Sequence, residues 1–187
     1  MDQLLTPKQV GQAIGVSESS LKRWCDRGVL PSSRTVGGHR RIPLASVIGY
    51  LRERNVDPSR PDILGLPSRS VLAFSSPSEA VQPLVCRLID GDLEGSRSVI
   101  VNLFMSGASI ASIGDELLSP AMSQVGSHWE SGDVQIYQER RAVGVTTRVL
   151  HEFSRLLPRS DPDASRAIVR RHDGSRGNIV GTRQQSK

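Results

Sequence analysis

Basic and hydroxyl side chains crowd into two short stretches of the first 45 residues. One stretch holds two serines followed by a lysine and an arginine, and the other surrounds the glycine pair Gly37-Gly38 with arginines and a histidine. Lysine and arginine bind phosphate and donate to the edges of bases, and serine hydroxyls bond to either. A nucleic acid is therefore the ligand that these residue types predict. The candidate DNA-binding side chains are Ser19, Ser20, Lys22, Arg23, Arg34, His39, Arg40 and Arg41.

The first stretch lies on the second of two predicted short helices. Thr6-Pro7 is an N-cap followed by proline at the first helical position, and the helix that it starts ends at Gly15. Ser17 caps a second helix, which Gly28 ends. Two short helices joined by a tight, glycine-containing turn predict a helix-turn-helix, with the polar residues of the second helix facing outward.

The second stretch predicts a thin basic hairpin. The Gly37-Gly38 pair favours a two-residue turn between two strands, and Pro43 and Leu44 start a third helix. Such a hairpin would hold four of the candidate side chains where they can reach phosphates.

Each of these residues also has a plainer explanation. A basic surface on an ordinary helical domain would carry similar charge, but the order of caps and hairpin favours DNA binding. Trp24 follows Leu21 by three residues and is predicted to lie in the core. No nucleophile or carboxylate accompanies His39, which is expected to contact phosphate or backbone. If Arg40 and Arg41 bind phosphates, replacing either by alanine weakens binding to all DNA sequences alike and lowers the salt slope by about one per contact.

The net charge of +5 over 187 residues is divided unevenly along the chain. Residues 1–60 carry a net +5, residues 61–157 a net −4 and residues 158–187 a net +4. A polyanion is expected to meet the basic ends and to be repelled by the acidic middle.

Composition argues against several classes of protein. Hydrophobic residues make up 37% of the chain and aromatic residues 4%, which is typical of helical modules with aliphatic cores. The best apolar run, Val99 to Met105, is too short to cross a membrane, and MDQLLTPKQV does not have the pattern of a secretory signal. Cys25 and Cys86 lack metal-binding spacing and are expected to be reduced thiols in the cytoplasm. We therefore expect a cytoplasmic protein with no membrane partner, no metal site and no catalytic residues.

The middle of the chain divides into a linker and a helical region. Residues 57–77 are rich in Pro, Ser and Arg and predict a linker with a short ordered piece at Val71-Leu72-Ala73-Phe74. Residues 78–158 hold four amphipathic helices with short connections, the last from Val134 to Leu157, and predict a four-helix bundle. The third of these helices is marked by Ile110, Ile113 and Leu117, and Ser119-Pro120 caps and restarts it.

The head, residues 1–56, resembles the winged helix-turn-helix of the MerR family and its excisionase-like relatives in the run TPKQVGQAIGVSESSLKRWCDRGVLP followed by GGHRRIP. This resemblance implies that the second helix enters the major groove and that the hairpin is a wing on the DNA backbone. By position, the groove-facing residues would be Ser19, Ser20, Lys22 and Arg23, and the wing residues Arg40 and Arg41.

The bundle resembles the helical cap of cobalamin-binding modules in the run LSPAMSQVGSHWESGDVQIYQERRA. Such caps occur in light-sensing cobalamin repressors and corrinoid methyltransferases, and share Pro-Ala-Met, Val-Gly, a Trp and, ten residues later, a Glu-His pair. Trp129 and Glu139 match this pattern, and Arg140 stands in the place of the histidine. Glu130 stands where light-sensing members carry the histidine that ligates cobalt from above. The resemblance makes Trp129, Glu139 and Arg140 candidate cofactor-binding residues, and a structural role for Trp129 and Glu139 is the alternative.

In that family the cap covers a Rossmann-like domain whose DxHxxG loop supplies the lower histidine. In this sequence Ala167-Ile168-Val169 stands where the first strand would be, Asn178 occupies the place of the histidine, and six residues follow Gly181. A family member truncated before this domain, with a largely disordered basic tail at residues 159–187, is the simplest account. Because a corrinoid needs burial between two surfaces, we expect no cofactor, with cobalamin as the alternative.

Taken together, these patterns predict a mainly α protein: a winged helix-turn-helix with a small β-hairpin, a linker, a four-helix bundle and a tail. The expected function is a sequence-specific transcriptional regulator that binds double-stranded operator DNA as a homo-oligomer, with the bundle used for oligomerisation or sensing.

Three other functions are weighed against this expectation. A cobalamin-dependent light or ligand sensor would use residual corrinoid binding by the cap. An excisionase-like DNA-bending protein would lack the long bundle. A methyltransferase accessory enzyme would need paired carboxylates, a Ser-His-Asp set, a Gly-rich phosphate loop or a metal cluster, and none of these patterns is found in the sequence.

Overall fold

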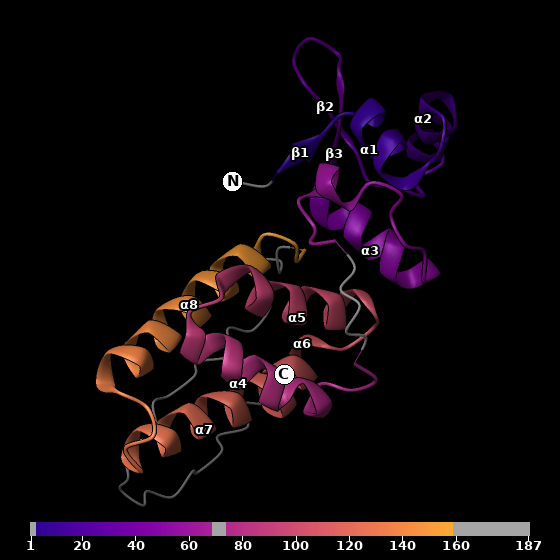
Figure 1. The fold of residues 1–187 in the computed structure, drawn as a ribbon. Coiled ribbons are helices and arrows are strands. Elements are labelled where there is room, and N and C mark those ends of the chain that lie inside the picture. Colours follow the sequence, from indigo (N-terminus) through magenta and orange to yellow (C-terminus); the bar gives the residue numbers. More distant parts are fainter. Residues whose placement is uncertain (1–2, 69–73, 159–187) are drawn as a thin grey trace, which may run out of the picture.

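The computed structural model describes residues 3–68 and 74–158, and these form a small head followed by a larger helical bundle (Figure 1). The elements of the head are β1 (Leu4–Leu5), α1 (Pro7–Ile14), α2 (Glu18–Asp26), β2 (Ser33–Arg34), β3 (Arg40–Pro43) and α3 (Leu44–Arg54). Those that follow are η1 (Pro61–Leu64), η2 (Ser78–Ala80), α4 (Val81–Asp90), α5 (Leu93–Met105), α6 (Ile110–Ser112), η3 (Ile113–Leu118), α7 (Ser119–Glu130) and α8 (Ile136–Ser154). The mainly helical fold predicted from the sequence is confirmed. The predictions for Val71 to Ala73 and for the tail, including the strand at Ala167 to Val169, lie outside the described residues.

Helix α1 begins and ends at the residues that the sequence indicates. The Thr6 hydroxyl accepts from the backbone N–H of Gln9, and the Gln9 side chain accepts from the backbone N–H of Thr6, which completes a capping box. Gly15 ends the helix in the left-handed conformation with φ 77°. Val10 and Ala13 are fully buried, so the short helix is held by its apolar face.

Helices α1 and α2 approach each other through a glycine. A Cβ added at Gly11 would lie 2.7 Å from the carbonyl oxygen of Val16, in the turn between the two helices. Ser17 then caps α2 by accepting from the backbone N–H of Ser20. Any side chain at residue 11 would push the turn away, so this position requires glycine.

The second helix packs inward through two residues. Leu21 is fully buried, and Trp24 is partly buried with its ring 5.4 Å from that of Tyr50 on α3. The interplanar angle of 37° makes this a tilted aromatic contact. The core placement predicted for Trp24 therefore holds in part, because the residue packs against the core but is only half-buried.

The sheet of the head has one strand more than the predicted hairpin. Strand β3 lies in the centre and pairs antiparallel with β2 on one side and with β1 on the other, where Leu5 faces Ile42. Leu5 and Ile42 are both buried. A strand of two residues has no alternation to detect, which is why the sequence did not indicate β1.

The turn of the hairpin differs from the two-residue turn predicted at Gly37-Gly38. The Thr35 N–H donates to the His39 carbonyl at 2.9 Å, and the Gly38 N–H donates to the Thr35 carbonyl at 2.8 Å. The loop therefore has three residues, and Gly38 takes the left-handed conformation with φ 77°. Only the second glycine needs a positive φ, as in a type I turn followed by a left-handed residue.

The segment predicted to be a linker, residues 57–77, contains ordered and buried parts. The 3₁₀ helix η1 packs on α1, and the Arg60 N–H donates to the Ala13 carbonyl at 3.0 Å. Leu64 is fully buried and Leu66 is nearly so. A single 3₁₀ turn shows no periodicity, so the proline-rich composition of the segment predicted a linker. Two of its leucines nevertheless belong to the core.

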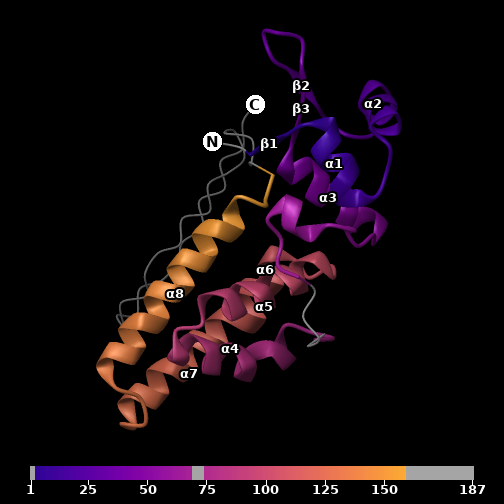
Figure 2. The ribbon, with the colours of Figure 1, turned by 45° about the horizontal axis from the view of Figure 1, so that its top comes forward.

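Four helical segments form the bundle, as predicted. Helix α4 contacts α5, α7 and α8, and α8 also contacts α5 and α7 (Figures 1 and 2). Each large aliphatic side chain that is fully buried here contributes about 1.5–3 kcal/mol relative to an exposed one. The fully buried residues include Leu84, Leu88, Ile100, Ile113, Leu117 and Val125.

The third segment of the bundle is one continuous run of three helical stretches, a π-helix between two α-helices. Residues Ile113–Leu118 form a π-helix between α6 and α7. Pro120 lies in the first turn of α7 and has no N–H to donate to the preceding turn, so the ladder is interrupted where the sequence predicts a restart. Ile110, which marks this helix in the sequence, is 53% exposed and does not belong to the core.

The last helix, α8, is shorter than predicted at both ends. Its first turn has a capping box between Gln135 and Gln138, so Val134 lies before the helix although its side chain is buried. Arg155 is the C-cap. Within residues 3–68 and 74–158, no helix combines the length and the apolar character needed to cross a membrane.

Candidate nucleic-acid interface

Helix α2 presents its polar side chains outward, and several of them are already bonded to one another. Ser19, Lys22 and Arg23 are exposed, and Ser20 is half-buried beside the N-cap. The Lys22 ammonium lies 2.8 Å from the Glu18 carboxylate one turn earlier. The hydrogen bond from Lys22 lowers the pKa of the Glu18 carboxyl. Arg23 reaches the Ser20 hydroxyl at 3.4 Å.

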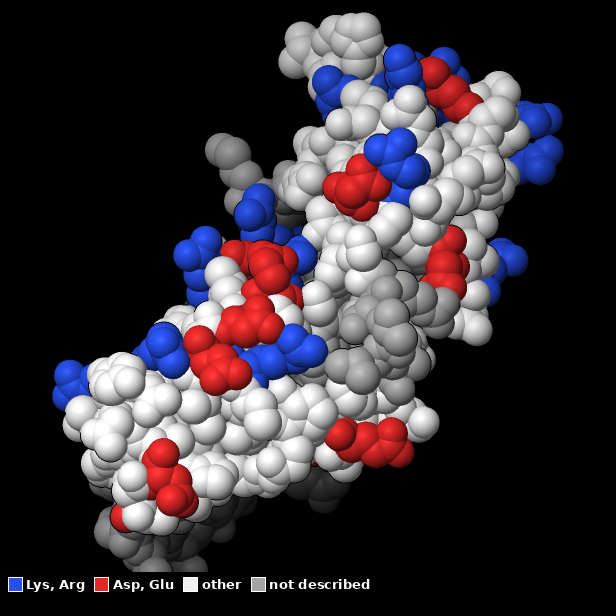
Figure 3. All heavy atoms as spheres, in the orientation of Figure 1, with Lys and Arg blue, Asp and Glu red and all other residues white. Residues whose placement is uncertain are grey.

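A hollow of about 450 Å³ lies between the start of α1, the helix α2 and the hairpin of residues 33–43, which we call the wing. Five lysine and arginine side chains, one histidine and one carboxylate, that of Glu18, line it. In Figure 3, lysine and arginine side chains gather on the head. The lining includes Lys8, Lys22, Arg34, His39, Arg40 and Arg41.

The hollow unites five of the eight predicted DNA-binding residues and adds one that the prediction lacked. Ser19, Ser20 and Arg23 are not among its lining residues. Lys8, in the first turn of α1, lines the hollow and is exposed. The charge of Lys8 is visible in the sequence, but only the fold brings the first turn of α1 beside the wing.

Arg40 makes internal contacts rather than projecting from the wing. Its guanidinium donates to the backbone carbonyl of Lys22 at 2.9 Å and to the Asp26 carboxylate at 2.6 Å, and its side chain is only 14% exposed. The hydrogen bond to Asp26 raises the pKa of Arg40. Arg40 thus ties strand β3 to the last turns of α2 and fixes the angle between wing and helix.

The other basic residues of the wing differ in how exposed they are. Arg34 and His39 are exposed, and Arg41 is half-buried at the side of the hollow. The His39 backbone N–H donates to the Thr35 hydroxyl at 3.2 Å, which steadies the loop. Val36, an apolar residue at the tip of the wing, is fully exposed.

The three candidate cofactor residues lie where α7 ends and α8 begins. Trp129 is 45% exposed near the end of α7, Glu139 is half-buried in the first turn of α8, and Arg140 beside it is exposed. The connection between the helices is held by a bond from the Val134 N–H to the His128 carbonyl at 3.0 Å.

That connection also contains a small polar cluster. The Ser131 hydroxyl donates to the Asp133 carboxylate at 2.7 Å, and His128 Nδ1 lies 3.6 Å from the same carboxylate. These two neighbours, the serine first, lower the pKa of the Asp133 carboxyl. The cluster sets the shape of the turn beside Trp129.

Helix α8 carries an exposed apolar stripe, which we call the α8 face. Ile136, Val143 and Leu150 recur every seven residues and are all exposed, as is Tyr137 next to the first of them. Residues seven apart lie on the same side of a helix, so Ile136, Val143 and Leu150 form a row along α8, with the polar Arg140 and Thr147 between them. An exposed apolar row of this kind is a candidate binding surface.

Two protein-family models match separate parts of the chain. Residues 4–55 match the model of a helix-turn-helix domain, and residues 80–152 match the model of a B12 binding domain. No curated protein matches the chain. The head is therefore a helix-turn-helix domain, and the bundle that follows it is the helical module of a B12 binding domain.

Proposed function

We propose that this protein is a sequence-specific transcriptional regulator of the MerR type, which binds double-stranded operator DNA through its winged helix-turn-helix. The observation that carries the proposal is the basic hollow between α1, α2 and the wing. Five cationic side chains around one concave surface offer a path for the phosphate backbone, and α2 offers polar groups to base edges.

The residues of the interface divide by role in this proposal. Ser19, Ser20 and Arg23 lie outside the hollow and face the major groove, where they read base edges. Within the hollow, Lys22 and Arg41 bind phosphate together with Lys8, Arg34 and His39. Arg40 holds the wing at the angle that lets both surfaces reach the DNA.

We propose further that the protein acts as a homo-oligomer in the cytoplasm. A single small winged domain buries little surface on DNA, and two copies reading symmetric half-sites add their contacts. Sedimentation of the complex with an operator fragment tests this, with two or more chains per fragment as the expected result and one chain as the contrary result.

The DNA-binding proposal is tested by a footprint on the DNA upstream of the protein's own gene. A protected site that persists at physiological salt is expected. Lys22→Ala and Arg41→Ala should each weaken binding and reduce the salt slope by about one. Arg148→Ala, at an exposed position on the bundle, is the matched control and should bind as the unaltered protein does. Binding that stays the same for all DNA sequences would contradict the proposal.

A second function is favoured by the α8 face and by the match to a B12 binding domain. In this candidate the protein senses light or a ligand through cobalamin. A corrin ring has a broad apolar face, and Trp129 with the exposed Ile136 and Val143 could cover it, with Glu139 and Arg140 at the polar periphery. Bound cobalamin would supply a cobalt centre for the sensing chemistry. The residues present fit one side of such a ring.

Cobalamin binding has a direct test that does not involve DNA. Adenosylcobalamin or hydroxocobalamin is mixed with the protein, the mixture is passed through a desalting column, and the visible spectrum of the protein fraction is recorded. Pigment eluting in stoichiometric amount with the protein and lost with Trp129→Ala supports the second function. A colourless protein fraction supports a bundle that acts without this cofactor.

A further inference from the structure

The serines at the start of α2 form a hydrogen-bonded network whose direction follows from the number of protons in it. Ser17 Oγ accepts from the backbone N–H of Ser20 at 3.1 Å and donates its only proton to Ser20 Oγ at 2.9 Å. Ser19 Oγ lies 3.0 Å from Ser17 Oγ. Because the Ser17 proton is already given to Ser20, the bond between Ser17 and Ser19 uses the proton of Ser19.

This direction leaves Ser19 as a hydrogen-bond acceptor. A serine hydroxyl has one proton and two lone pairs, and the proton of Ser19 is directed back to the N-cap. The lone pairs remain, and the side chain is exposed. An unrestrained serine can bond to a donor or to an acceptor on a base, but Ser19 in this network is matched to a donor.

Ser20 and Arg23 have the opposite polarity. Ser20 Oγ accepts from Ser17 and also, in a longer contact of 3.4 Å, from Nη2 of Arg23, so both of its lone pairs are in use. A guanidinium carries donors only, arranged in a planar fork. Ser20 holds one arm of this fork from a position three residues earlier on the helix, which restricts where Arg23 points.

Of the two neighbouring cations on α2, Arg23 is the one suited to a base. Lys22 is paired with Glu18 at 2.8 Å and lines the basic hollow, where phosphate is proposed to bind. Arg23 lies outside that hollow, and its side chain bonds to a hydroxyl rather than to a carboxylate. A planar guanidinium forms two parallel hydrogen bonds to O6 and N7 of guanine.

The spacing of these groups matches the edge of one base pair. Ser19 and Arg23 are four residues apart, so they are neighbours on one face of α2. In the major groove, a G·C pair presents the two acceptors of guanine beside the N4 amino group of cytosine, which is a donor. Adenine and thymine each present a single acceptor there, and cytosine presents none. A donor fork beside an acceptor is therefore complementary to G·C.

We propose that α2 recognises a G·C base pair in the major groove, where Arg23 donates to O6 and N7 of the guanine and Ser19 accepts from N4 of the cytosine. This proposal rests on the proposed DNA binding and names the base pair that the helix reads. Ser20 is a positioning residue, because it acts on the guanine through Arg23. Lys22 stays on phosphate and contributes no base preference.

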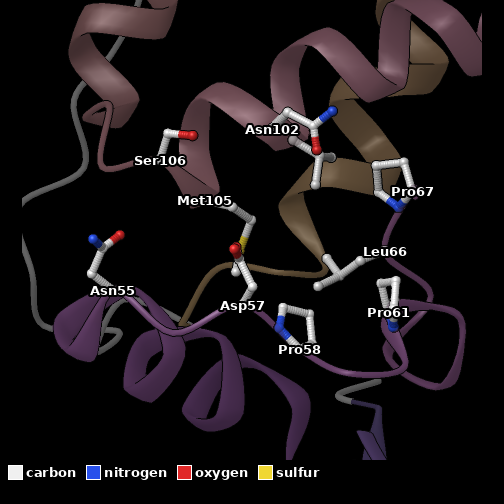
Figure 4. Close-up of a pocket in the computed structure, with 10 residues that line it drawn as sticks. Asn55, Asp57, Pro58, Pro61, Leu66, Pro67, Asn102, Met105 and Ser106 are labelled. Atoms are coloured by element: carbon white, nitrogen blue, oxygen red, sulfur yellow. The ribbon is translucent and has the colours of Figure 1, made fainter. Parts of the chain in front are cut away.

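The substitutions that test this proposal lie away from the contact between head and bundle. Figure 4 shows the pocket between the chain after α3 and the second half of α5, where those two parts meet. The first residue of its lining along the chain is Asn55, so α2 contributes nothing to it. Changes on the outward side of α2 are therefore not expected to act through this junction.

The test compares affinities for the footprinted operator with those for fragments in which each base pair is replaced in turn, by fluorescence anisotropy. One G·C pair is expected at which any replacement lowers the affinity of the unaltered protein about tenfold or more. Arg23→Lys keeps the charge and loses the fork, so it should remove the preference at that pair and leave the salt slope unchanged. Arg27→Lys makes the same change at the exposed C-cap of α2 and should alter no preference.

Variants of the two serines, combined with modified bases, test the direction of the network. Ser20→Ala should reduce the preference for the same pair, Ser20→Thr should retain it, and adding Ser20→Ala to Arg23→Lys should cause no further loss. Replacing the guanine by 7-deazaguanine removes N7 and should weaken the unaltered protein but not Arg23→Lys. Replacing the cytosine by N4-methylcytosine blocks the free amino hydrogen and should weaken the unaltered protein but not Ser19→Ala.

Each part of the proposal can be contradicted separately from the proposed function. Base preferences that Arg23→Lys leaves unchanged, or that Arg27→Lys removes equally, would overturn the role of Arg23 while a protected operator still supports DNA binding. A Ser19→Ala variant that N4-methylcytosine still weakens would overturn the acceptor role of Ser19. Equal affinity of the unaltered protein for every replaced fragment would overturn both this proposal and the proposed function.

Discussion

At the scale of single residues, the contact between Arg40 and Asp26 gives a test in which two explanations predict opposite signs. Asp26 is a negative charge near the proposed DNA surface, so charge alone predicts that Asp26→Ala raises DNA affinity. If instead Asp26 holds Arg40 and thereby the wing, the same change lowers the affinity. We expect the lower affinity, and we expect the double variant with Arg40→Ala to be no weaker than Arg40→Ala alone, measured by fluorescence anisotropy.

Glu18 provides the matched control for this test. It too is an acidic residue on α2, but its partner is the exposed Lys22, which lines the hollow. Glu18→Gln should raise DNA affinity because it releases Lys22 and removes a charge. If both acidic variants raised the affinity, Asp26 would have no bracing role.

A second prediction at this scale concerns the acidity of Asp133. Its pKa is lowered first by the hydrogen bond from Ser131 and next by His128. Ser131→Ala should therefore raise the pKa of Asp133 towards its ordinary value, and by more than His128→Ala does. Because a depressed carboxyl pKa stabilises the fold above the unfolded-state pKa and loses that effect as the pH falls, Ser131→Ala should also be less sensitive to mild acid. An NMR titration of the Asp133 carboxyl carbon measures the shift directly, and equal pKa values in the variant and the unaltered protein would contradict it.

At the scale of helices and strands, the turn between α1 and α2 depends on the absence of a side chain at residue 11. Gly11→Ala would place a methyl group 2.7 Å from the Val16 carbonyl, against backbone that cannot move aside easily. We expect a loss of about 1–3 kcal/mol in the free energy of unfolding. Gly49→Ala in α3 is the control, because an added methyl meets nothing within 4 Å there. That variant should gain about 0.5–1 kcal/mol from helix propensity. Urea denaturation of both variants measures these changes in the free energy of unfolding.

Some of the helices and strands can be predicted from local sequence signals, and others cannot. Caps are local, so Thr6 and Ser17 indicated the starts of α1 and α2 correctly. Elements too short to show a hydrophobic period could not be predicted. The two residues of β1 pair with a strand almost forty residues away, and η1 is a single turn packed on α1. In the candidate interface the residue types were visible in the sequence. Their roles were not, because only the fold brings Arg40 against Asp26 and Lys8 beside the wing.

At the scale of the whole molecule, two parts with opposite charge share one hydrophobic core, and Arg52 of α3 bonds to the end of α5 at the junction between them. The head and its following segment are basic and the bundle is acidic. In the proposed regulator, this arrangement keeps the acidic bundle off the DNA. The strength of that junction is therefore the property on which communication between bundle and head would depend.

Arg52 is the residue through which the strength of the junction can be measured. Its guanidinium makes two charge-assisted bonds to carbonyls at the end of α5 and covers the Phe104 ring, and that ring in turn meets Phe153 of α8 edge-on at 5.0 Å. Arg52→Met keeps much of the apolar bulk and removes both bonds, which we expect to cost about 2–4 kcal/mol. Hydrogen exchange should become faster at Ser106 to Ala108 and in α3, while the interior of α4 stays protected. Arg54→Met, at an exposed position two residues later, is the control and should exchange as the unaltered protein does. Unchanged exchange in Arg52→Met would mean that apolar contacts alone hold the head to the bundle.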